Sequence, residues 1–407
     1  TVSGSGTATA VSLGSVCWPI LRRAGYPREQ AGGMLAAAGI GAILSPPTLG
    51  AAAFIIAELL RTSYLTVLIY AMVPTLLYYA GIILAIEIDA RRRQDTTPVE
   101  IPAGSAVRLF LRFGYHLSSL LLIVVFMAFG IPPFKAVVYA TGLQLVLSFL
   151  DPEHRMMPRR IADALVAGTR NALPVIAVCA AAGVITAVVG LTGLGLDLSS
   201  MIVGLARLMT DHPTVVLLLT ALLSALAVSV LGLALPVTAS FVIASVVIAP
   251  ALIELGIPAP AAYMFIFYYS VLSEVSPPTA LAAVAASAIT GGDPIRTMWA
   301  TWRYALPAFL VPFAFVLTDN GRLLLGQGPI LSILWAFAIS LVAVFALATA
   351  TGGHIVGRAV WPERGLAAVA ALLLLYLQPT TIVVGLVLLG LVIGLHVVRI
   401  RLTIRRA

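Results

Sequence analysis

One short motif occurs twice in this chain, inside two longer stretches that share the same pattern. Ser-Pro-Pro-Thr stands at Ser45–Thr48 and returns 231 positions later, from 45 to 276, as Ser276–Thr279. Duplicated apolar segments that are interrupted by proline and glycine indicate the binding site of a secondary transporter. The repeat therefore predicts a membrane carrier. The same offset holds upstream without a gap and pairs Thr7-Ala8-Thr9 with Thr238-Ala239-Ser240, Pro19 with Pro250, Gly25 with Gly256, and Pro27 with Pro258.

The composition predicts a membrane protein independently of the repeat. Hydrophobic residues make up 61% of the chain and charged residues only 10%, which is outside the range of soluble domains. Many apolar runs are long enough to cross a bilayer, and they are rich in Leu and Ala without period-two alternation, so they should be helices. The predicted fold is an all-α polytopic membrane protein. The runs are Tyr64–Ile86, Gly114–Gly130, Phe134–Leu150, Ala172–Gly190, Thr214–Gly232, Ala262–Ala288, Ala305–Leu317, Ile330–Ala350 and Thr380–His396.

The distribution of the net charge of +8 indicates membrane topology and not a nucleic-acid partner. Clusters of arginine alternate along the chain with segments that carry only isolated cations, as in polytopic proteins whose basic loops are cytoplasmic. We expect a multi-pass protein of a bacterial or archaeal inner (cytoplasmic) membrane, with the basic loops and the C-terminus in the cytoplasm. The clusters are Arg22-Arg23 with Arg28, Arg91-Arg92-Arg93, Arg155 with Arg159-Arg160, Arg296 with Arg303, Arg358 with Arg364, and Arg399, Arg401, Arg405 and Arg406.

Each copy of the repeat is predicted to form a re-entrant hairpin followed by a broken helix. A break between two short apolar arms places the hairpin tip at mid-membrane. Two consecutive prolines bar the α conformation for the residue before them, so Ser45 and Ser276 should be unwound. Non-helical backbone at this depth is tolerated only where it lines a protein or water cavity. The hairpin breaks are expected at Gly4 and Gly6 in the first copy and at Gly232 and Pro236 in the second.

The two repeats should be inverted relative to each other. An odd number of crossings, five, is expected between the bases of the two hairpins. The charges agree, because Arg22 and Arg23 stand at the base of the first hairpin and Glu254 at the base of the second. The first hairpin should open on the cytoplasmic side and the second on the outer side. An interfacial arm helix is expected at Ile161–Arg170, because its apolar and charged residues lie on different faces.

Hydroxyl and freed carbonyl oxygens at the breaks form the candidate site. Such hard oxygen ligands suit a small cation, and opposing half-helix N-termini suit a substrate carboxylate. Sodium or a proton is the expected coupling ion, with no other cofactor. The expected cation-binding residues are Ser3, Ser5, Thr7, Ser45, Thr48, Thr238, Ser240, Ser276, Thr279 and Glu274. The expected substrate-binding residues are Gly4, Gly6, Pro46, Pro47, Pro236, Pro277 and Pro278.

Glu274 is the ionisable residue of this candidate site. It stands two residues before Ser276 in an apolar span, where the first copy has Ile43. Acidic residues inside a membrane are functional by default, although pairing with a hydroxyl or the backbone would be a purely structural role. We expect Glu274 either to couple transport to protons or to act as a cation ligand. His396 lies near the end of a span without a second ligand at metal-binding spacing, and a structural role is expected for it.

These motifs resemble the large membrane subunit of tripartite ATP-independent periplasmic (TRAP) transporters, in particular the fused permeases that work with TAXI-type binding proteins. The resemblance runs from residue 1 to about Leu317. It implies that the chain is not an enzyme, that an elevator-type transport domain moves against a scaffold, and that an ion gradient drives import of an organic acid from a periplasmic binding protein. It is strongest at Gly4-Ser5-Gly6-Thr7-Ala8, Pro46-Pro47 with Gly50-Ala51-Ala52-Ala53-Phe54, Thr192-Gly193-Leu194-Gly195, Gly232-Leu233-Ala234-Leu235-Pro236, and Pro277-Pro278 with Ala280-Leu281-Ala282.

The chain departs from the pattern of this family at two positions. Val237 stands where a hydroxyl residue is usual in the second hairpin, and Glu274 is ionisable where small or polar uncharged residues are common. Val237 removes one hydroxyl ligand, and Glu274 adds an ionisable group. Sodium is therefore not the only coupling ion to consider. Two other readings stay open: an elevator carrier for dicarboxylates that needs no binding protein, and an intramembrane hydrolase with Ser5 as nucleophile, which lacks a histidine in a comparable broken helix.

The same resemblance suggests how the chain is divided. We expect a first transport repeat at 1–87, scaffold helices with the arm at 88–171, a second transport repeat at 172–317 and additional membrane helices at 318–407, like those of the fused TAXI class. The second hairpin is preceded by the apolar arm Thr214–Leu231, which the first copy lacks. We therefore expect a missing N-terminal part of the same permease, or a small membrane subunit, as a partner.

Overall fold

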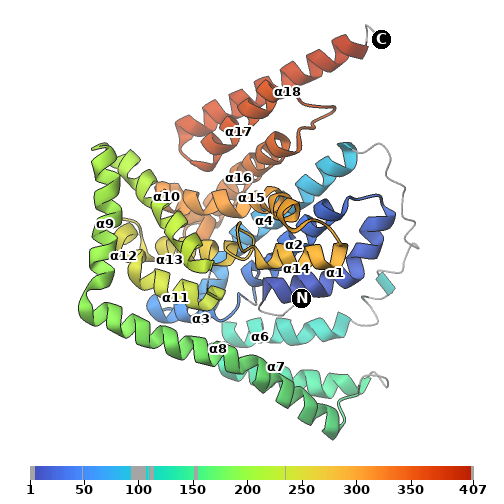
Figure 1. Ribbon diagram of the computed structural model, residues 1–407, viewed down its shortest axis with the longest axis vertical. Helices are drawn as coiled ribbons and strands as arrows, with labels where there is room; N and C mark the ends of the chain where they lie inside the picture. The colour runs from blue at the N-terminus through green and yellow to red at the C-terminus, as the bar shows by residue number, and fades with distance from the viewer. Residues whose placement is uncertain are drawn as a thin grey trace.

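The computed structural model describes residues 5–47, 49–92, 107–108, 110, 114–150, 155–233 and 235–404. Helices dominate these ranges, and no named strand occurs within them (Figure 1). Six of the described helices are long and apolar enough to cross a membrane, and the bent pair Cys179–Thr192 and Leu194–Met209 could provide a seventh span. The prediction of an all-α polytopic membrane fold is confirmed.

The helices of the two repeats begin at equivalent or nearly equivalent residues. At the offset of 231, the N-terminal residue of α1 coincides with that of α11, and that of α2 with that of α13. The turn after each hairpin contains a glycine with positive φ, 80° at Gly25 and 86° at Gly256. The pairs are α1 (Gly6–Arg23) with α11 (Val237–Val247) and α12 (Ala249–Glu254), α2 (Arg28–Leu44) with α13 (Ala259–Leu272), α3 (Ala52–Leu59) with α14 (Leu281–Thr290), and α4 (Tyr64–Arg92) with α15 (Pro294–Leu317).

Both broken helices are interrupted where the sequence predicts. α2 ends at Leu44, and Ser45 has an extended backbone (φ −96°, ψ 128°). Ser276 lies in the non-helical segment between α13 and α14. The bond between the two prolines is cis in both copies. The prediction that both serines are unwound is confirmed.

The hairpins and broken helices of the two repeats are interlocked. The second hairpin consists of α10 (Pro213–Gly232) and α11, with Pro236 as the N-cap residue of α11. The half-helix α14 of the second repeat packs against α1 and α2 of the first (Figure 1). In return, α3 of the first repeat packs against α11 of the second.

The two hairpins open toward opposite ends of α15. At the N-terminal end of α15, the Arg28 side chain at the base of the first hairpin donates to the carbonyl of Gly291 (3.3 Å). At the other end, Leu255 at the base of the second hairpin shares a cavity with Leu317. This arrangement is the inversion that the crossing count and the charges predict.

The expected arm helix is part of a longer helix. The segment Ile161–Arg170 and the run Ala172–Gly190 lie in one continuous helix, α8 (Pro158–Thr192). Extending a helix across their junction avoids leaving two further helix ends with unpaired backbone groups. The bend comes later, at Gly193, whose φ of 73° separates α8 from α9 (Leu194–Met209) at an angle of 75°. α6 (Ser118–Ala128) and α7 (Pro133–Leu147) pack against each other (Figure 1).

The last three helices form a C-terminal extension in which each helix packs against the next. They are α16 (Ile330–Gly352), α17 (Trp361–Leu375) and α18 (Pro379–Ile404), connected to α15 by the 3₁₀ helix Asp319–Leu325. His396 is fully buried, and its Nδ1 lies 2.9 Å from a Glu363 carboxylate oxygen. The Arg399 guanidinium donates to the same oxygen (3.1 Å). This buried ion-pair cluster ties α17 to α18, in agreement with the structural role expected for His396.

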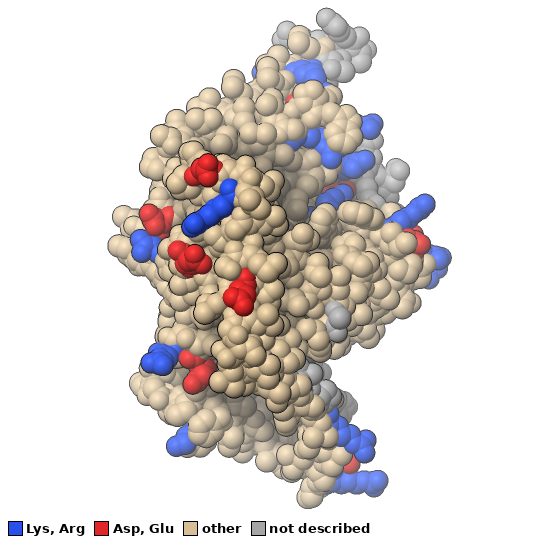
Figure 2. Space-filling model, turned by 60° about the vertical axis from the view of Figure 1, so that its left-hand side comes forward, with Lys and Arg blue, Asp and Glu red and all other residues tan. Residues whose placement is uncertain are grey.

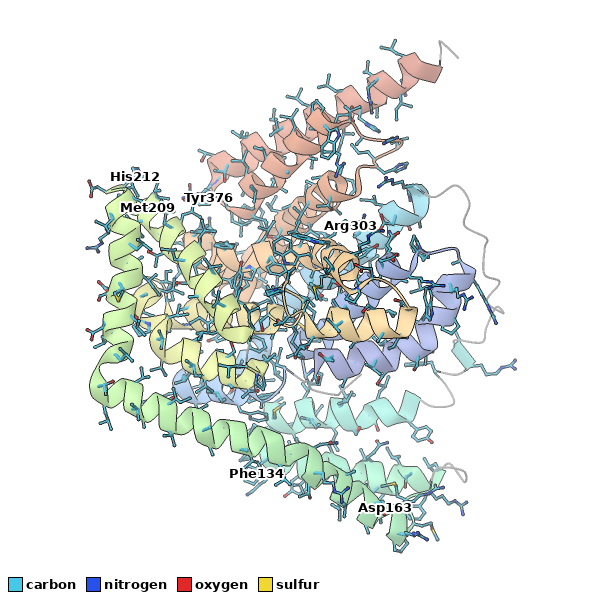
Figure 3. The ribbon with its side chains drawn as sticks, viewed as in Figure 1. Phe134, Asp163, Met209, His212, Arg303 and Tyr376 are labelled. Carbon is cyan, nitrogen blue, oxygen red and sulfur yellow. The ribbon has the colours of Figure 1, made fainter. Side chains whose placement is uncertain are left out.

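Basic residues that are far apart in sequence share one end of the molecule. Arg91 and Arg92 at the end of α4 lie close enough to His354, in the α16–α17 loop, that their charges lower its pKa, although burial is the larger cause. Figure 2 shows charged side chains toward both sides of the view, with uncharged surface between them. The α9–α10 corner, labelled by Met209 and His212 in Figure 3, lies on the opposite side of the molecule from Asp163 in α8.

Candidate functional site

Two adjacent residues at the break of α13 touch the tips of both hairpins. A Cβ atom added to Gly232, at the end of α10, would lie 2.3 Å from the Ser273 side chain. A Cβ added to Gly6, at the start of α1, would lie 2.5 Å from Oε2 of Glu274. The broken helix of the second repeat therefore contacts the first hairpin through Glu274 and the second hairpin through Ser273.

Glu274 faces the N-terminus of α1. The backbone amides of Gly6 and Thr7 lie beside its carboxylate, and the N-terminal end of a helix favours negative charge. Its Oε2 atom is buried, and it has no hydrogen-bond partner with normal geometry among the described residues. Because neither amide completes a hydrogen bond of normal geometry to Oε2, this atom can accept a proton or bind a cation without losing one.

The start of α1 is held in place by Ser5 and by close packing on α2. Ser5 is the N-cap residue, and its Oγ accepts from the amide of Ala8 (3.3 Å). A Cβ on Gly39 would lie 2.6 Å from the carbonyl oxygen of Gly6. Only glycine at this position of α2 lets the two backbones approach so closely. The packing places the first hairpin tip beside Gly39, about 9 Å along α2 before Ser45.

At the first break, the polar groups already bond to each other and to α4. Ser45 Oγ donates to the carbonyl of Gly41, and it lies 2.9 Å from the Tyr79 hydroxyl. The Leu44 carbonyl accepts from Thr75 Oγ1 (2.6 Å). The Pro47 carbonyl accepts from the Tyr64 hydroxyl (3.0 Å). Side chains of α4 thus occupy oxygens that the sequence assigned to a cation.

At the second break, nearby backbone amides bond to most of the freed carbonyl oxygens. The carbonyl of Glu274 accepts from the amide of Ala282 (3.0 Å), and the carbonyl of Ser276 accepts from Ala280 (3.1 Å). Ser276 Oγ donates to the Leu272 carbonyl (2.8 Å), as Ser45 does to Gly41 in the first copy. The serine before each proline pair therefore closes the last turn of its own helix.

Several hydroxyls around the second hairpin are buried without a partner. Ser240 on α11 is fully buried, its Oγ has no hydrogen-bond partner among the described residues, and it lies near Gly232. Ser270 on α13 is also fully buried, and its Oγ has no hydrogen-bond partner among the described residues. An unpaired buried hydroxyl is costly, so these oxygens are available to a ligand. Thr220 and Ser224 on α10 are further members of this group.

The remaining predicted residues are distributed as follows. Thr238 and Thr279 are partly exposed. Ser3, Gly4 and Thr48 lie outside the described residues. Among the predicted prolines, Pro46, Pro47 and Pro277 are partly buried, whereas Pro236 and Pro278 are exposed.

No cluster of three or more His, Cys, Asp or Glu side chains that could hold a metal ion occurs in the described part of the chain. A cation at the breaks would therefore rely on hydroxyl and carbonyl oxygens, with Glu274 as the available carboxylate. Sodium binds to ligands of this kind, and it needs fewer charges around it than a divalent ion.

The sequence analysis missed a buried polar cluster that joins the first broken helix to α4 and α15. Asp89 is 3% exposed, and its carboxylate accepts from Gln30 Nε2 (2.6 Å), from Arg303 and from the Tyr304 hydroxyl. The signal was present, because Asp89 follows a long apolar run and must find partners if it is buried. A second signal concerned the first break. Thr75 and Tyr79 lie four residues apart on α4, so their hydroxyls share one face of that helix, and both contact the break.

The comparisons with known proteins agree with this architecture. A search of curated proteins found no match. The family model described as "Tripartite ATP-independent periplasmic transporter, DctM component" matches residues 1–319. The match covers both repeats, both hairpin tips and Glu274, and it leaves α16, α17 and α18 outside. The family is one of transporters, whose DctM component works with a periplasmic binding protein and a small membrane subunit. The chain therefore belongs to the DctM family, the large permease components of TRAP transporters.

Proposed function

We propose that this permease imports an organic acid that a periplasmic binding protein, of the TAXI type, delivers, and that an ion gradient drives the import. The observation that supports this most directly is the contact of Ser273 and Glu274 with both hairpin tips. A site at which two inverted hairpins and a broken helix meet can be exposed to either side of the membrane when the transport domain moves. The N-terminal ends of α1 and α14 favour negative charge, which suits a substrate carboxylate.

The coupling ion would bind at the second break. Glu274 Oε2 and the Ser240 and Ser270 hydroxyls are buried without partners among the described residues. A proton on Glu274, or a sodium ion beside it, would satisfy an oxygen that otherwise stays unpaired. The basic end of the molecule would face the cytoplasm of a cell whose inner membrane holds the protein, as positively charged loops do.

Glu274→Gln tests this coupling, because glutamine mimics the protonated acid. Uptake is measured with full-length permease in vesicles, with the binding protein and substrate outside, at several pH values and sodium concentrations. If protons drive transport, the variant loses the pH dependence of uptake. If sodium does, it needs more sodium and keeps its pH profile. Glu254→Gln, at the exposed base of the second hairpin, is the matched control. Wild-type behaviour of Glu274→Gln in both assays would contradict the proposal.

Dependence on a binding protein is tested in the same vesicles. We expect little uptake until the cognate binding protein is added. Uptake at full rate without it would favour the alternative, an elevator carrier for dicarboxylates that collects substrate directly from solution. Because this assay compares the same permease with and without one component, its result does not depend on the role of Glu274.

A further inference from the structure

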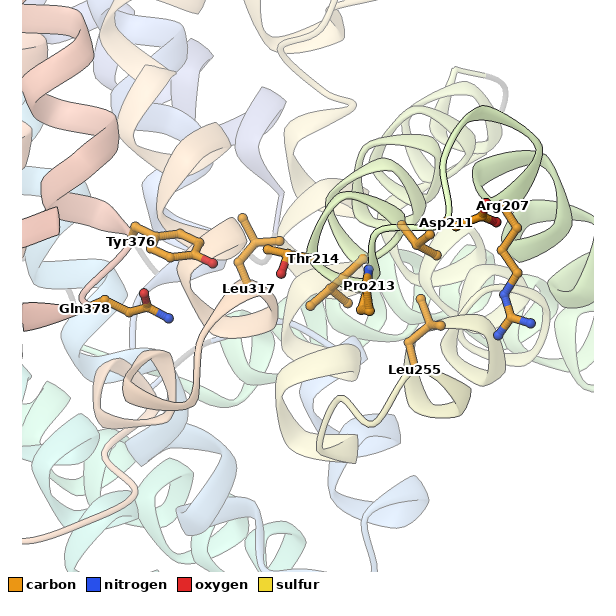
Figure 4. A pocket seen from close by; sticks show the side chains of 10 residues that line it. Arg207, Asp211, Pro213, Thr214, Leu255, Leu317, Tyr376 and Gln378 are labelled. Atoms are coloured by element: carbon orange, nitrogen blue, oxygen red, sulfur yellow. The ribbon is translucent and has the colours of Figure 1, made fainter. Parts of the chain in front are cut away.

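Two cavities meet where α9 turns into α10. The first, of about 570 Å³, is lined by polar groups that include Arg207, Asp211 and Tyr376 (Figure 4). The second, of about 370 Å³, is lined almost entirely by apolar side chains. Thr214, Leu317 and Tyr376 line both, so the polar cavity continues into the apolar one. Together they form a crevice with a charged mouth and an apolar slot.

The apolar slot runs inward from the ends of three helices. On α10, Thr214, Leu218 and Leu222 line it one turn after another, and two turns of α-helix extend about 11 Å. The slot is bordered by the last turns of α15 and α17 on its other sides. Leu218 and Leu222 are 39% and 46% exposed, so the described protein leaves them open to the acyl-chain region of a bilayer.

The mouth carries one charge of each sign. Neither Arg207 nor Asp211 has a side-chain ion pair or hydrogen bond among the described residues. Arginine binds phosphate oxygens through charge-assisted hydrogen bonds, and a carboxylate pairs with an ammonium group. A ligand with a phosphate, an ammonium group and an apolar chain complements all three features of the crevice.

We propose that this crevice binds one phosphatidylethanolamine molecule, with its phosphate at Arg207, its ammonium group at Asp211 and one acyl chain in the slot. An anionic phospholipid would satisfy Arg207 but place its charge beside Asp211. A small soluble solute would leave the slot empty. An acyl chain moves from the bilayer into the slot without leaving apolar surroundings, so the headgroup contacts decide which lipid binds.

The position of the crevice gives this lipid a structural role. α10 and α15 belong to the region that the DctM family model matches, whereas Tyr376 on the α17–α18 turn lies outside it. The lipid would fill the joint between the second hairpin and the C-terminal helices. It would therefore be a partner that this chain, with its extension, binds in addition to its transported substrate.

The test is lipid titration of the full-length chain in detergent, with bound lipids counted by native mass spectrometry. We expect wild-type protein to bind one phosphatidylethanolamine in preference to phosphatidylglycerol. Arg207→Ala should weaken both lipids roughly ten- to a hundredfold, as the loss of a hydrogen bond to a charged group implies. Asp211→Asn should weaken phosphatidylethanolamine alone and remove the preference. Arg322→Ala is the matched control, because Arg322 donates to the Asp319 carbonyl and does not line the crevice.

Two further measurements test the proposal even if Arg207→Ala or Asp211→Asn folds poorly. Leu222→Trp narrows the slot without touching the mouth, and it should reduce phosphatidylethanolamine binding. Soluble glycerophosphoethanolamine should fail to displace the lipid at equal concentration. Equal binding of both lipids by wild-type protein, unchanged preference in Asp211→Asn, or displacement by the soluble headgroup would each overturn the proposal.

Discussion

The two broken helices have the same backbone course but different chemistry around it. At the first break, hydroxyl groups of the following helix, α4, bond to the interrupted backbone and to Ser45. At the second break, the equivalent positions of α15 are apolar, and local amides cap the carbonyls. The first break is closed by side chains, and the second is not. The paired positions are Tyr64 with Ile295, Thr75 with Leu306, and Tyr79 with Leu310.

The ionisable group shows the opposite asymmetry. The second break has Glu274 where the first has Ile43, and Ile43 is buried in the apolar core. Glu274 lies against the hairpin of the other repeat. The duplicated backbone therefore forms two similar breaks. Under the proposed function, the second break provides most of the groups that would bind the coupling ion. The first break would then be structural: side chains of α4 hold it in place, and α2 packs against the tip of its own hairpin.

The largest effect should come from Gly6→Ala. The equivalent residue of the second hairpin is Val237, which packs against the apolar core, so a side chain is accommodated there. At Gly6 a Cβ would lie 2.5 Å from Glu274 Oε2 and 2.9 Å from Ile40 Cγ2. We expect uptake to fall about a hundredfold, since displacements of about 1 Å at a reacting centre have effects of that order.

Gly204→Ala is the control for this substitution, because no atom would lie within 4 Å of its new Cβ. Both variants are compared by initial uptake rate at equal amounts of folded protein. Wild-type uptake by Gly6→Ala would show that Glu274 and the tip of α1 need not stay in contact during transport.

The next largest effect is expected for Ser5→Ala. If Ser5 is a cation ligand, the variant should need roughly ten to a hundred times more of the coupling ion, because a dry site loses one oxygen. It also loses the N-cap of α1, which is worth about 1 kcal/mol. Ser5→Thr keeps a hydroxyl and separates the two effects. An ion requirement that stays unchanged in Ser5→Ala would limit coupling to the second repeat.

A smaller effect on stability should follow from Thr75→Val. The substitution keeps the shape of the side chain and leaves the Leu44 carbonyl without its donor, which should destabilise the protein by about 1–3 kcal/mol. Thermal unfolding in lipid nanodiscs measures this loss. Thr141→Val is the control, since Thr141 bonds within exposed α7. A change in ion affinity with no change in stability would contradict the view that the first break is a support.

The smallest expected effect distinguishes the C-terminal helices from both repeats. Burial, and then the positive charges of His396, Arg91 and Arg92, lower the pKa of His354 below the ordinary histidine value of 6.5. Below pH 6.5 the unfolded chain therefore binds a proton that the folded chain does not, and stability falls until the folded pKa is passed.

His354→Gln should reduce this loss of stability between pH 7.5 and 5.5, as measured by the melting temperature. It should leave the pH dependence of uptake unchanged, because His354 lies outside both repeats. A shift of the uptake profile in His354→Gln would move the origin of that dependence away from Glu274.

The sequence predicted the elements that depend on local rules. Glycine and proline mark the hairpin tips and breaks, so Gly25, Gly256 and both Pro-Pro pairs are found where the pattern placed them. The sequence could not predict which side chains would occupy the freed carbonyls. That depends on how α4 and α15 pack against the breaks, and packing brings together residues about 30 positions apart, such as Thr75 and Leu44.

The continuity of the arm segment with the apolar run that follows it in α8 could not be predicted, for a related reason. A change from polar to apolar residues marks a change of environment, and it does not by itself end a helix. The contact of Glu274 with Gly6 could not be predicted from the sequence repeat either. The repeat relates Glu274 to Ile43 and Gly6 to Val237, but it does not show which repeat faces which.

The exchange of half-helices between the repeats has a consequence for how such a chain can arise and fold. α14 completes the packing around the first hairpin, and α3 contacts the second. Neither half can therefore bury its own surfaces alone. This is the arrangement of an antiparallel homodimer whose subunits have been joined end to end. Each half completes the packing of the other, so the first half should reach its final packing only when the second half is present.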